Sequence, residues 1–491
     1  MFDLEPEDIT DGPLFRGLVV LSVPLLAQNV VQVIQQVIDL FWVGRLSNDA
    51  VAAVGLTVPL IVILFAVSIV IPFVGTQVLV SQRVGSENIS GARRAMFSGL
   101  LIAACIGIVL GGLAFVTARP LIDLLLSTRP EAATNHVIEL AAAYFGVTAL
   151  GVCISGISDT TEAAFIGWGD SRTALYMNAT ALSVNILLDP ILIFGFRESP
   201  LFEPLGLMGV QSTLFSVTHF AGIGIEGAAL ANIIGYGIGG ALGLVLVARG
   251  RNEGMLSRSA AQINRDDIRE LIDIGAPSGG QLIAKQTVEL VLVVVVFGTA
   301  GAAGLAAYIV GFRVSSVAVV PSDSLRQAAQ SVVGQNLGAG LSGRAHRATW
   351  IGVGAAAGVL LLLGIVQWAI PSTLVHLFVP SLSPEATRLA VDYLVILAYG
   401  YPAIGAAYLF QAGFNGARRT KTSFVASLFQ YWGVRFPIAA VGGIVLSFGV
   451  HAVFWAITIS NIVAAIGLGG YYHYSTADGM FDRAAETATA D

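Results

Sequence analysis

The sequence predicts an all-α polytopic membrane protein, with twelve transmembrane helices in two six-helix lobes related by a pseudo-two-fold axis along the membrane normal. Three observations predict this fold class: an apolar composition, long uncharged stretches and an internal duplication. Of the 491 residues, 55% are hydrophobic and 11% are charged, and the mean hydropathy is +0.80. Because soluble domains carry roughly 25% charged residues, this chain has too few charges for a water-facing surface.

Uncharged stretches define the expected spans. A bilayer core about 30 Å thick needs roughly 20 apolar residues per helix. A helix satisfies its own backbone hydrogen bonds in lipid, and the stretches lack the period-2 alternation of a membrane β-barrel. In chain order they are 17–38, 50–82, 95–118, 140–158, 173–188, 227–248, 290–312, 348–384, 393–417 and 436–477. The longest can hold two spans or a span and a loop, so we expect twelve helices.

Basic residues predict the orientation. Sixteen of the 25 Lys and Arg residues fall in connectors and tails on one side of the spans, and five fall on the other. Because bases are enriched in cytoplasmic loops, we expect a multi-pass protein of the cell membrane with both termini cytoplasmic. The expected parts are a solvated acidic cytoplasmic tail (1–15), an N-lobe with helices 1–6 (16–248), a cytoplasmic linker (249–270), a C-lobe with helices 7–12 (271–475) and a cytoplasmic tail (476–491).

An internal duplication relates the two halves. A shift of 253 positions aligns residues 24–95 with 277–348, and a shift of 249 aligns a second block. The matched pairs include Pro24/Pro277, Gln28/Gln281, Gln77/Gln330, Gln82/Gln335, Gly85/Gly338, Tyr144/Tyr393 and Gly167/Gly416. Polar and helix-breaking residues rarely coincide by composition alone, so two lobes of the same orientation are predicted, as in transporters with parallel repeats.

The first predicted helix carries an acid within the membrane. Asp39 follows Gln32 and Gln35 at helical spacing, so the three share one face. An intramembrane acid costs about 2.5–3.5 kcal/mol on insertion scales, which points to a cavity or a bound cation. The alternative is that Asp39 only reaches the headgroups near Arg45. Pro24 lies 15 residues earlier and would let the helix bend.

The fifth predicted helix carries a second acid. Asn185 and Asp189 are one turn apart, and Pro190 follows. Their oxygens suit Na⁺, and the carboxylate can take a proton instead. The alternative is a structural hydrogen bond to a neighbouring helix.

The second half carries charges in a different pattern. Lys285 and Glu289 are four residues apart, and Asp323 and Arg326 are three apart. Both spacings favour local ion pairs, with a substrate site as the alternative for the first pair. The chain has no Walker P-loop, no HExxH and no Gly-x-Ser-x-Gly, and no basic block. We therefore expect no enzyme, no cofactor and no nucleic-acid partner.

These residues resemble the multidrug and toxic compound extrusion (MATE) family of cation-coupled antiporters over nearly the whole chain. The matching features are Pro24, Gln32 and Asp39 with 43–44 in the first helix, Gln77, Gln82 and Gly85 near the end of the second, Tyr144 in the fourth, and Asn185, Asp189 and Pro190 in the fifth. The fifth-helix pattern and Tyr144 are similar to the archaeal and DNA-damage-inducible-F-like branch.

The sequence also departs from the family's patterns. The sister branch named for norfloxacin efflux has acids on helices 7 and 10, where this chain has Lys285 and Ile404. Asn232 stands in place of a threonine, and Glu162 in place of an asparagine. The resemblance thus implies a cation site in the N-lobe and none in the C-lobe.

The resemblance implies an antiporter that exports amphipathic, often cationic, drugs by alternating access, functions as a monomer in the lipid bilayer and couples to H⁺ or Na⁺. The expected cation-coupling residues are Asp39, Asn185 and Asp189, which are also the expected Na⁺ ligands, with Gln32, Tyr144, Asn232 and Glu162, and Pro24 is the expected conformational switch. The alternative is a lipid-linked oligosaccharide flippase of the same superfamily, for which Arg313, Arg326 and Arg435 would supply a basic cavity.

Overall fold

The computed structural model describes residues 6–127, 134–204, 206–253, 262–380 and 382–490, and every regular element in these ranges is a helix. Ten helices are long and apolar enough to cross a membrane, and the pair Pro384–Ala398 and Tyr401–Gly416, bent by 52°, adds an eleventh crossing. The longest helix, α11 (Arg265–Gly338), has 74 residues and turns back at Gly301, so it supplies two spans. The twelve predicted spans are thereby confirmed over the described residues.

The N-lobe contains the first six crossings. Its spans are α2 (Leu14–Leu46), α3 (Asn48–Phe65) continued by η1 (Ala66–Val70) and α4 (Ile71–Gly85), α5 (Ile89–Val116), α7 (Asn135–Trp168), α8 (Ser171–Glu198) and α10 (Ile225–Ala248). Two short helices, α6 (Ala118–Leu125) and α9 (Met208–Thr218), lie in connectors. A 3-10 turn, η3 (Arg251–Glu253), follows α10.

The C-lobe contains the other six crossings. They are formed by the two arms of α11, by α12 (Ser342–Ala369), by α14 (Pro384–Ala398) with α15 (Tyr401–Gly416), by α16 (Thr420–Leu428) with η5 (Phe429–Arg435), α17 (Phe436–Ala440) and η6 (Val441–Val445), and by α18 (Val450–Ala477). The connector helix α13 (Pro371–Phe378) joins α12 to α14. The elements η5 and η6 are π-helical.

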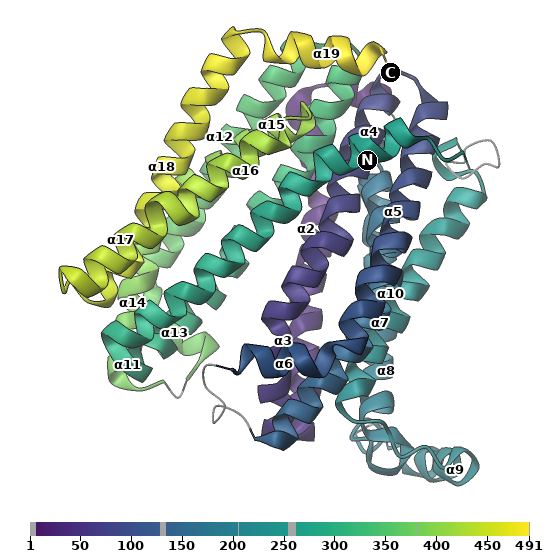
Figure 1. Cartoon of the computed structure of the whole chain (residues 1–491), viewed down its shortest axis with the longest axis vertical. Coiled ribbons are helices and arrows are strands. Elements are labelled where there is room, and N and C mark those ends of the chain that lie inside the picture. The colour runs from purple at the N-terminus through teal and green to yellow at the C-terminus, as the bar shows by residue number, and fades with distance from the viewer. Residues whose placement is uncertain (1–5, 128–133, 205, 254–261, 381, 491) are drawn as a thin grey trace.

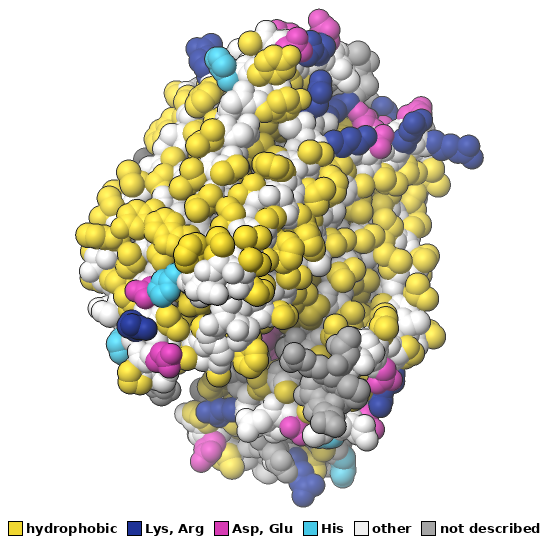
Figure 2. Space-filling view, turned by 60° about the vertical axis from the view of Figure 1, so that its left-hand side comes forward, with side chains coloured by type: hydrophobic (Ala, Val, Ile, Leu, Met, Phe, Trp, Pro, Cys, Tyr) yellow, Lys and Arg dark blue, Asp and Glu magenta, His cyan; other side chains and the backbone are white. Residues whose placement is uncertain are grey.

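The helices of the two lobes converge at the end of the molecule where both termini lie and diverge toward the other end (Figure 1). We call these the terminal end and the opposite end. Charged side chains gather at both ends, and a broad hydrophobic band lies between them (Figure 2). This distribution is what a bilayer requires of a multi-pass protein.

Glutamines from both lobes join the lobes at the terminal end. Gln82 Nε2 donates to the Gly416 carbonyl oxygen at 2.7 Å, and Gln335 Nε2 donates to the Gly167 carbonyl oxygen at 2.8 Å. The two bonds are equivalent under the duplication, since Gln82 pairs with Gln335 and Gly167 with Gly416. A further bond links Gln330 Nε2 to Gln77 Oε1 at 2.8 Å. The repeated polar residues of the sequence therefore form the contact between the lobes.

Two glycines allow the helices to approach this closely. A Cβ atom on Gly85 would lie 2.0 Å from the Gln335 carbonyl oxygen, and one on Gly338 would lie 1.9 Å from the Gln82 carbonyl oxygen. Real Cβ atoms do not approach backbone oxygen this closely, so only glycine fits at either position while the lobes are closed.

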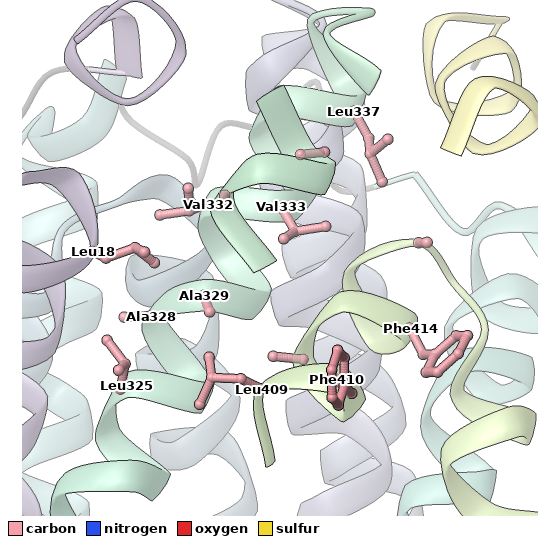
Figure 3. Packing of buried hydrophobic residues seen from close by; sticks show 14 of the residues in the cluster. Leu18, Leu325, Ala328, Ala329, Val332, Val333, Leu337, Leu409, Phe410 and Phe414 are labelled. Carbon is pink, nitrogen blue, oxygen red and sulfur yellow. The ribbon is translucent and has the colours of Figure 1, made fainter. Parts of the chain in front are cut away.

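An apolar cluster and an ionic cluster reinforce the closed terminal end. Leu18 of α2 packs with Leu325 of α11 and Leu409 of α15 (Figure 3). Arg83 Nη2 lies 2.5 Å from Asp267 Oδ1. Burying one leucine is worth about 1.5–3 kcal/mol relative to leaving it in water. The closed end would expose both clusters if it opened.

The two predicted tails are partly folded against the rest of the chain. Helix α1 (Pro6–Thr10) buries Ile9, whose carbonyl oxygen accepts hydrogen bonds from Asn336 and Arg344. Helix α19 (Met480–Ala490) buries Met480 and Phe481. The expectation of a solvated N-terminal tail is therefore wrong for Ile9, because one apolar residue in a polar segment is enough to anchor it. Residues 1–5 lie outside the described ranges.

We expect Gly85→Ala to open the terminal end. The added methyl group must displace the Gln335 backbone, and overpacking of this kind costs about 1–3 kcal/mol. Spin labels on the ends of the two lobes should show longer distances by double electron–electron resonance. The control is Gly354→Ala on α12, whose Cβ would meet nothing within 4 Å. An unchanged distance distribution in Gly85→Ala would contradict this account of the closed end.

Candidate functional site

Four helices of the N-lobe bring two acids together. Asp39 comes from α2, Asp189 and Asn185 from α8, Asn232 from α10, and Tyr144 from α7. Asn232 Nδ2 donates to Asp39 Oδ2 at 3.0 Å, and Asn185 Nδ2 donates to Asp189 Oδ1 at 3.3 Å. The two carboxyl groups interact electrostatically with each other, and Tyr144 interacts electrostatically with both.

The electrostatic interaction between the carboxyl groups has a chemical consequence. Two neighbouring carboxylates repel each other, and a proton or a cation between them relieves this repulsion. Three oxygens of this cluster, Asp39 Oδ1, Asp189 Oδ2 and Asn185 Oδ1, are buried without a hydrogen-bond partner in the described residues. Unpaired carboxylate and amide oxygens are the ligands that hard cations prefer. The donor set therefore fits a proton or Na⁺.

Gln35 fixes the orientation of the Asn232 side-chain amide in this cluster. Gln35 Nε2 donates to Asn232 Oδ1 at 2.6 Å. Because the Asn232 oxygen is occupied, its amide nitrogen is turned toward Asp39. Gln35 thus orients the amide group that donates to Asp39.

A second acidic cluster lies nearer the terminal end of the N-lobe. Glu162 of α7 accepts hydrogen bonds from Gln28 Nε2 at 2.5 Å and from Asn178 Nδ2 at 2.7 Å. Gln32 donates to Asn178 Oδ1 at 3.3 Å, so Gln32 belongs to this cluster and does not contact Asp39 directly. Asp159 interacts electrostatically with Glu162.

Two members of this second cluster, Asp159 and Asn178, were not among the residues predicted from the sequence. Asp159 precedes Glu162 by three residues on the same helix, and this spacing was a signal that could have found it. Asn178 gave no signal, because its role follows only from the packing of α8 beside α7. Tyr236 of α10 interacts electrostatically with Asp159, Glu162 and Asp39, so it lies within electrostatic range of both clusters.

The C-lobe repeats the geometry of the second cluster without its charge. Gln281 donates to Ser427 Oγ at 2.7 Å and to Gln411 Oε1 at 3.3 Å. Under the duplication these residues match Gln28, Asn178 and Glu162. The position matching Asp39 is Leu292, which is fully buried. The C-lobe thus lacks the pair of acids.

The two local ion pairs expected in the C-lobe are present, and both line a cavity of about 500 Å³. Lys285 Nζ lies 3.9 Å from Glu289 Oε1, and Arg326 Nη2 lies 2.7 Å from Asp323 Oδ1. The exposed Arg313 is not among the residues that line this cavity.

The fold and these sites define a class of protein: a two-lobed, twelve-span membrane transporter. A family model described as MatE matches residues 24–191 and 277–441, one segment in each lobe. The chain therefore belongs to the MATE family.

Relatives and solved structures agree with this assignment. A probable multidrug resistance protein YpnP of Bacillus subtilis (strain 168) is 25% identical over 88% of this chain and 89% of its own length. An FAD transporter of Shewanella oneidensis is 24% identical over 94% and 95%. The outward-facing structure of a multidrug resistance MATE family transporter of the MOP superfamily has a TM-score of 0.84 at 21% identity, over 97% of this chain and 98% of that one.

The chain is accordingly a multi-pass membrane protein of a multidrug efflux transporter family and not an enzyme. The predicted fold class and family are both confirmed. The roles of the individual site residues in cation coupling stay predictions.

We expect Asn232→Leu to destabilise the protein by about 1–3 kcal/mol, because it strands the Asp39 carboxyl group without its amide donor. Adding Asp39→Leu should recover most of this loss, since the double variant leaves no buried carboxyl group there. The melting temperatures of the two single variants and the double variant in detergent form the test. Additive losses would show that the two side chains are not coupled.

Proposed function

We propose that the chain is an antiporter that exports amphipathic organic compounds by alternating access, driven by H⁺ or Na⁺ bound in the N-lobe. The observation that carries the proposal is the set of unpaired oxygens on Asp39, Asp189 and Asn185. Neither acid has an ion pair with a base in the described residues. A cation entering the lobe is the charge that this cluster lacks.

The membrane potential acting on one cation per transport cycle is sufficient to drive export. Moving one elementary charge through 100 mV yields about 2.3 kcal/mol. Since 1.4 kcal/mol corresponds to a factor of ten, one cation can sustain a drug gradient of roughly fiftyfold, with no cofactor and no nucleotide.

The closed terminal end supports a route for the cation. Glutamine bonds, the leucine cluster and Arg83–Asp267 close that end, whereas the helices diverge at the opposite end (Figure 1). In the proposed cycle the cation enters from the opposite end, which the excess of bases at the terminal end predicts to be extracellular. Neutralising the acids then favours a second arrangement of α2, which runs without a break through Pro24 in this structure.

The organic substrate is proposed only as a class. The relatives' names include multidrug resistance and FAD transport, so amphipathic compounds are the common description. The protein is proposed to act as a monomer, because both acidic clusters and the C-lobe cavity lie within one chain.

The flippase alternative has weaker support. A diphosphate would need several unpaired bases in one cavity, but Arg326 is paired with Asp323 and Arg313 lies outside the cavity. Arg435 is the base that is left, and one arginine suits a ligand with less charge.

We expect Asp189→Asn to abolish coupled efflux while the protein still folds. The amide keeps the shape of the side chain but loses the proton and one cation ligand. The assay is substrate export from proteoliposomes under an imposed H⁺ or Na⁺ gradient. Asp123→Asn is the matched control, because Asp123 is exposed and pairs with Arg119 at the surface. Near-normal pumping by Asp189→Asn would remove Asp189 from the mechanism.

We also expect Pro24→Ala to impair transport at least tenfold more than Pro277→Ala. Both prolines weaken their helices, but only the helix of Pro24 carries an acid, since Leu292 stands where Asp39 would be. Initial transport rates in proteoliposomes, normalised to inserted protein, give the comparison. Equal losses would mean that the prolines serve packing alone.

A further inference from the structure

The cavity of the C-lobe differs in polarity from the N-lobe. It is lined by parts of α11, α14, α15, η5 and α18, including the aromatic residues Tyr308, Phe312, Tyr393, Tyr408 and Tyr431. Its volume of about 500 Å³ falls within the range of about 300–1,000 Å³ that is usual for small-molecule sites. The N-lobe concentrates buried acids, whereas this cavity contains more bases than acids.

The charges in the cavity do not cancel. Three bases line it, Lys285, Arg326 and Arg435, against two acids, Glu289 and Asp323. Each acid has a base of its own, as the distances of 3.9 Å and 2.7 Å show. Arg435 therefore remains as the base without a carboxylate partner in the described residues.

Arg435 is held in place by neutral groups. Its Nε donates to Ser460 Oγ at 2.9 Å, its Nη2 donates to Asn461 Oδ1 at 2.8 Å, and its Cζ lies 4.6 Å from the centre of the Tyr431 ring. The residue is 6% exposed. Neutral acceptors orient a guanidinium but leave its positive charge uncompensated, and an uncompensated charge is costly in a site of low dielectric.

Two further observations favour a ligand in this cavity. The Ser278 hydroxyl lines the same cavity and is buried without a hydrogen-bond partner in the described residues. Arg435 also ends the π-helix η5, and π-helical turns are frequent at functional sites. Under the duplication the N-lobe has Ile186 at the position of Arg435. The arginine is thus a feature of this cavity and not a consequence of the repeat.

We propose that the C-lobe cavity binds an amphipathic aromatic anion, whose acidic group pairs with Arg435 and whose ring packs against the tyrosines. The inference rests on the proposed function for its role in export, but the binding itself does not. A planar guanidinium can donate two parallel hydrogen bonds to a carboxylate, sulfonate or phosphate group. The acids of the N-lobe would repel the same ligand, so the coupling cation and the exported anion would occupy different lobes.

A pair of probes that differ in charge tests the proposal. 1-Naphthaleneacetate and 1-naphthylmethylammonium carry the same ring and opposite charges, and their binding to the full chain in phosphatidylcholine nanodiscs can be measured by isothermal titration calorimetry. We expect the anion to bind at least about tenfold more tightly than the cation, as a charge-assisted hydrogen bond allows. Equal binding of the two probes, or tighter binding of the cation, would overturn the proposal.

Variants locate the site. Arg435→Gln should weaken anion binding at least about tenfold, whereas Arg435→Lys should keep most of it. The matched control, Arg313→Gln, removes an exposed arginine of the same lobe that lies outside the cavity, and it should leave binding unchanged. If Arg435→Gln does not fold, Glu289→Gln gives the opposite test, because removing an acid from the cavity should strengthen anion binding. Anion binding that is indifferent to Arg435 and Glu289 would overturn the proposal.

Two further experiments complete the test. The first distinguishes a lipid headgroup from a soluble anion, and the second distinguishes failure of the anion site from failure of the proposed function. Nanodiscs that contain phosphatidylglycerol should weaken 1-naphthaleneacetate binding if a lipid headgroup is the natural anion, and should not if the anion is soluble; either result supports an anion site. Asp189→Asn should bind the anion as the unmodified protein does. Normal pumping by Asp189→Asn would remove Asp189 from the proposed coupling mechanism and leave the anion site standing, whereas equal binding of the two probes would remove the anion site alone.

Discussion

The electrostatic repulsion between the carboxyl groups of Asp39 and Asp189 is the constraint on which the proposed mechanism depends. Two neighbouring negative charges in a medium of low dielectric repel each other, and no base of the described residues is paired with either. In the proposed mechanism, a proton or a cation relieves this repulsion. The proposed site lies at the junction of α2, α8 and α10. Binding or release of the cation there can therefore change how these helices pack.

The two lobes share a backbone plan and differ in chemistry. The repeat keeps the residues that close the terminal end, such as Gln82 and Gln335, because both lobes must meet there. It does not keep the residues of the lobe interiors, where Glu162 of the N-lobe corresponds to Gln411 of the C-lobe. Duplication followed by separate use of the two interiors explains why acids collect in one lobe and an unpaired arginine in the other.

Much of the fold could be predicted from the sequence, because the uncharged stretches and the repeated prolines, glutamines and glycines are local signals. The cluster around Asp39 and Asp189 could also be anticipated, since an acid in an apolar helix stands out. Asn178 could not be placed in the same way, because an isolated polar residue acquires a role only from what packs beside it. The anchoring of Ile9 was missed for the same reason, as a single apolar residue in an acidic segment gives no periodic pattern.

Cation coupling is the central claim, and gradient-driven transport tests it most directly. Proteoliposomes with the purified protein would be loaded with a fluorescent amphipathic substrate, and H⁺ and Na⁺ gradients would be imposed separately at constant membrane potential. The account predicts that one of the two gradients drives export and that reversing this gradient reverses the direction of transport. Transport that follows the substrate gradient alone, unchanged by either cation, would contradict the account.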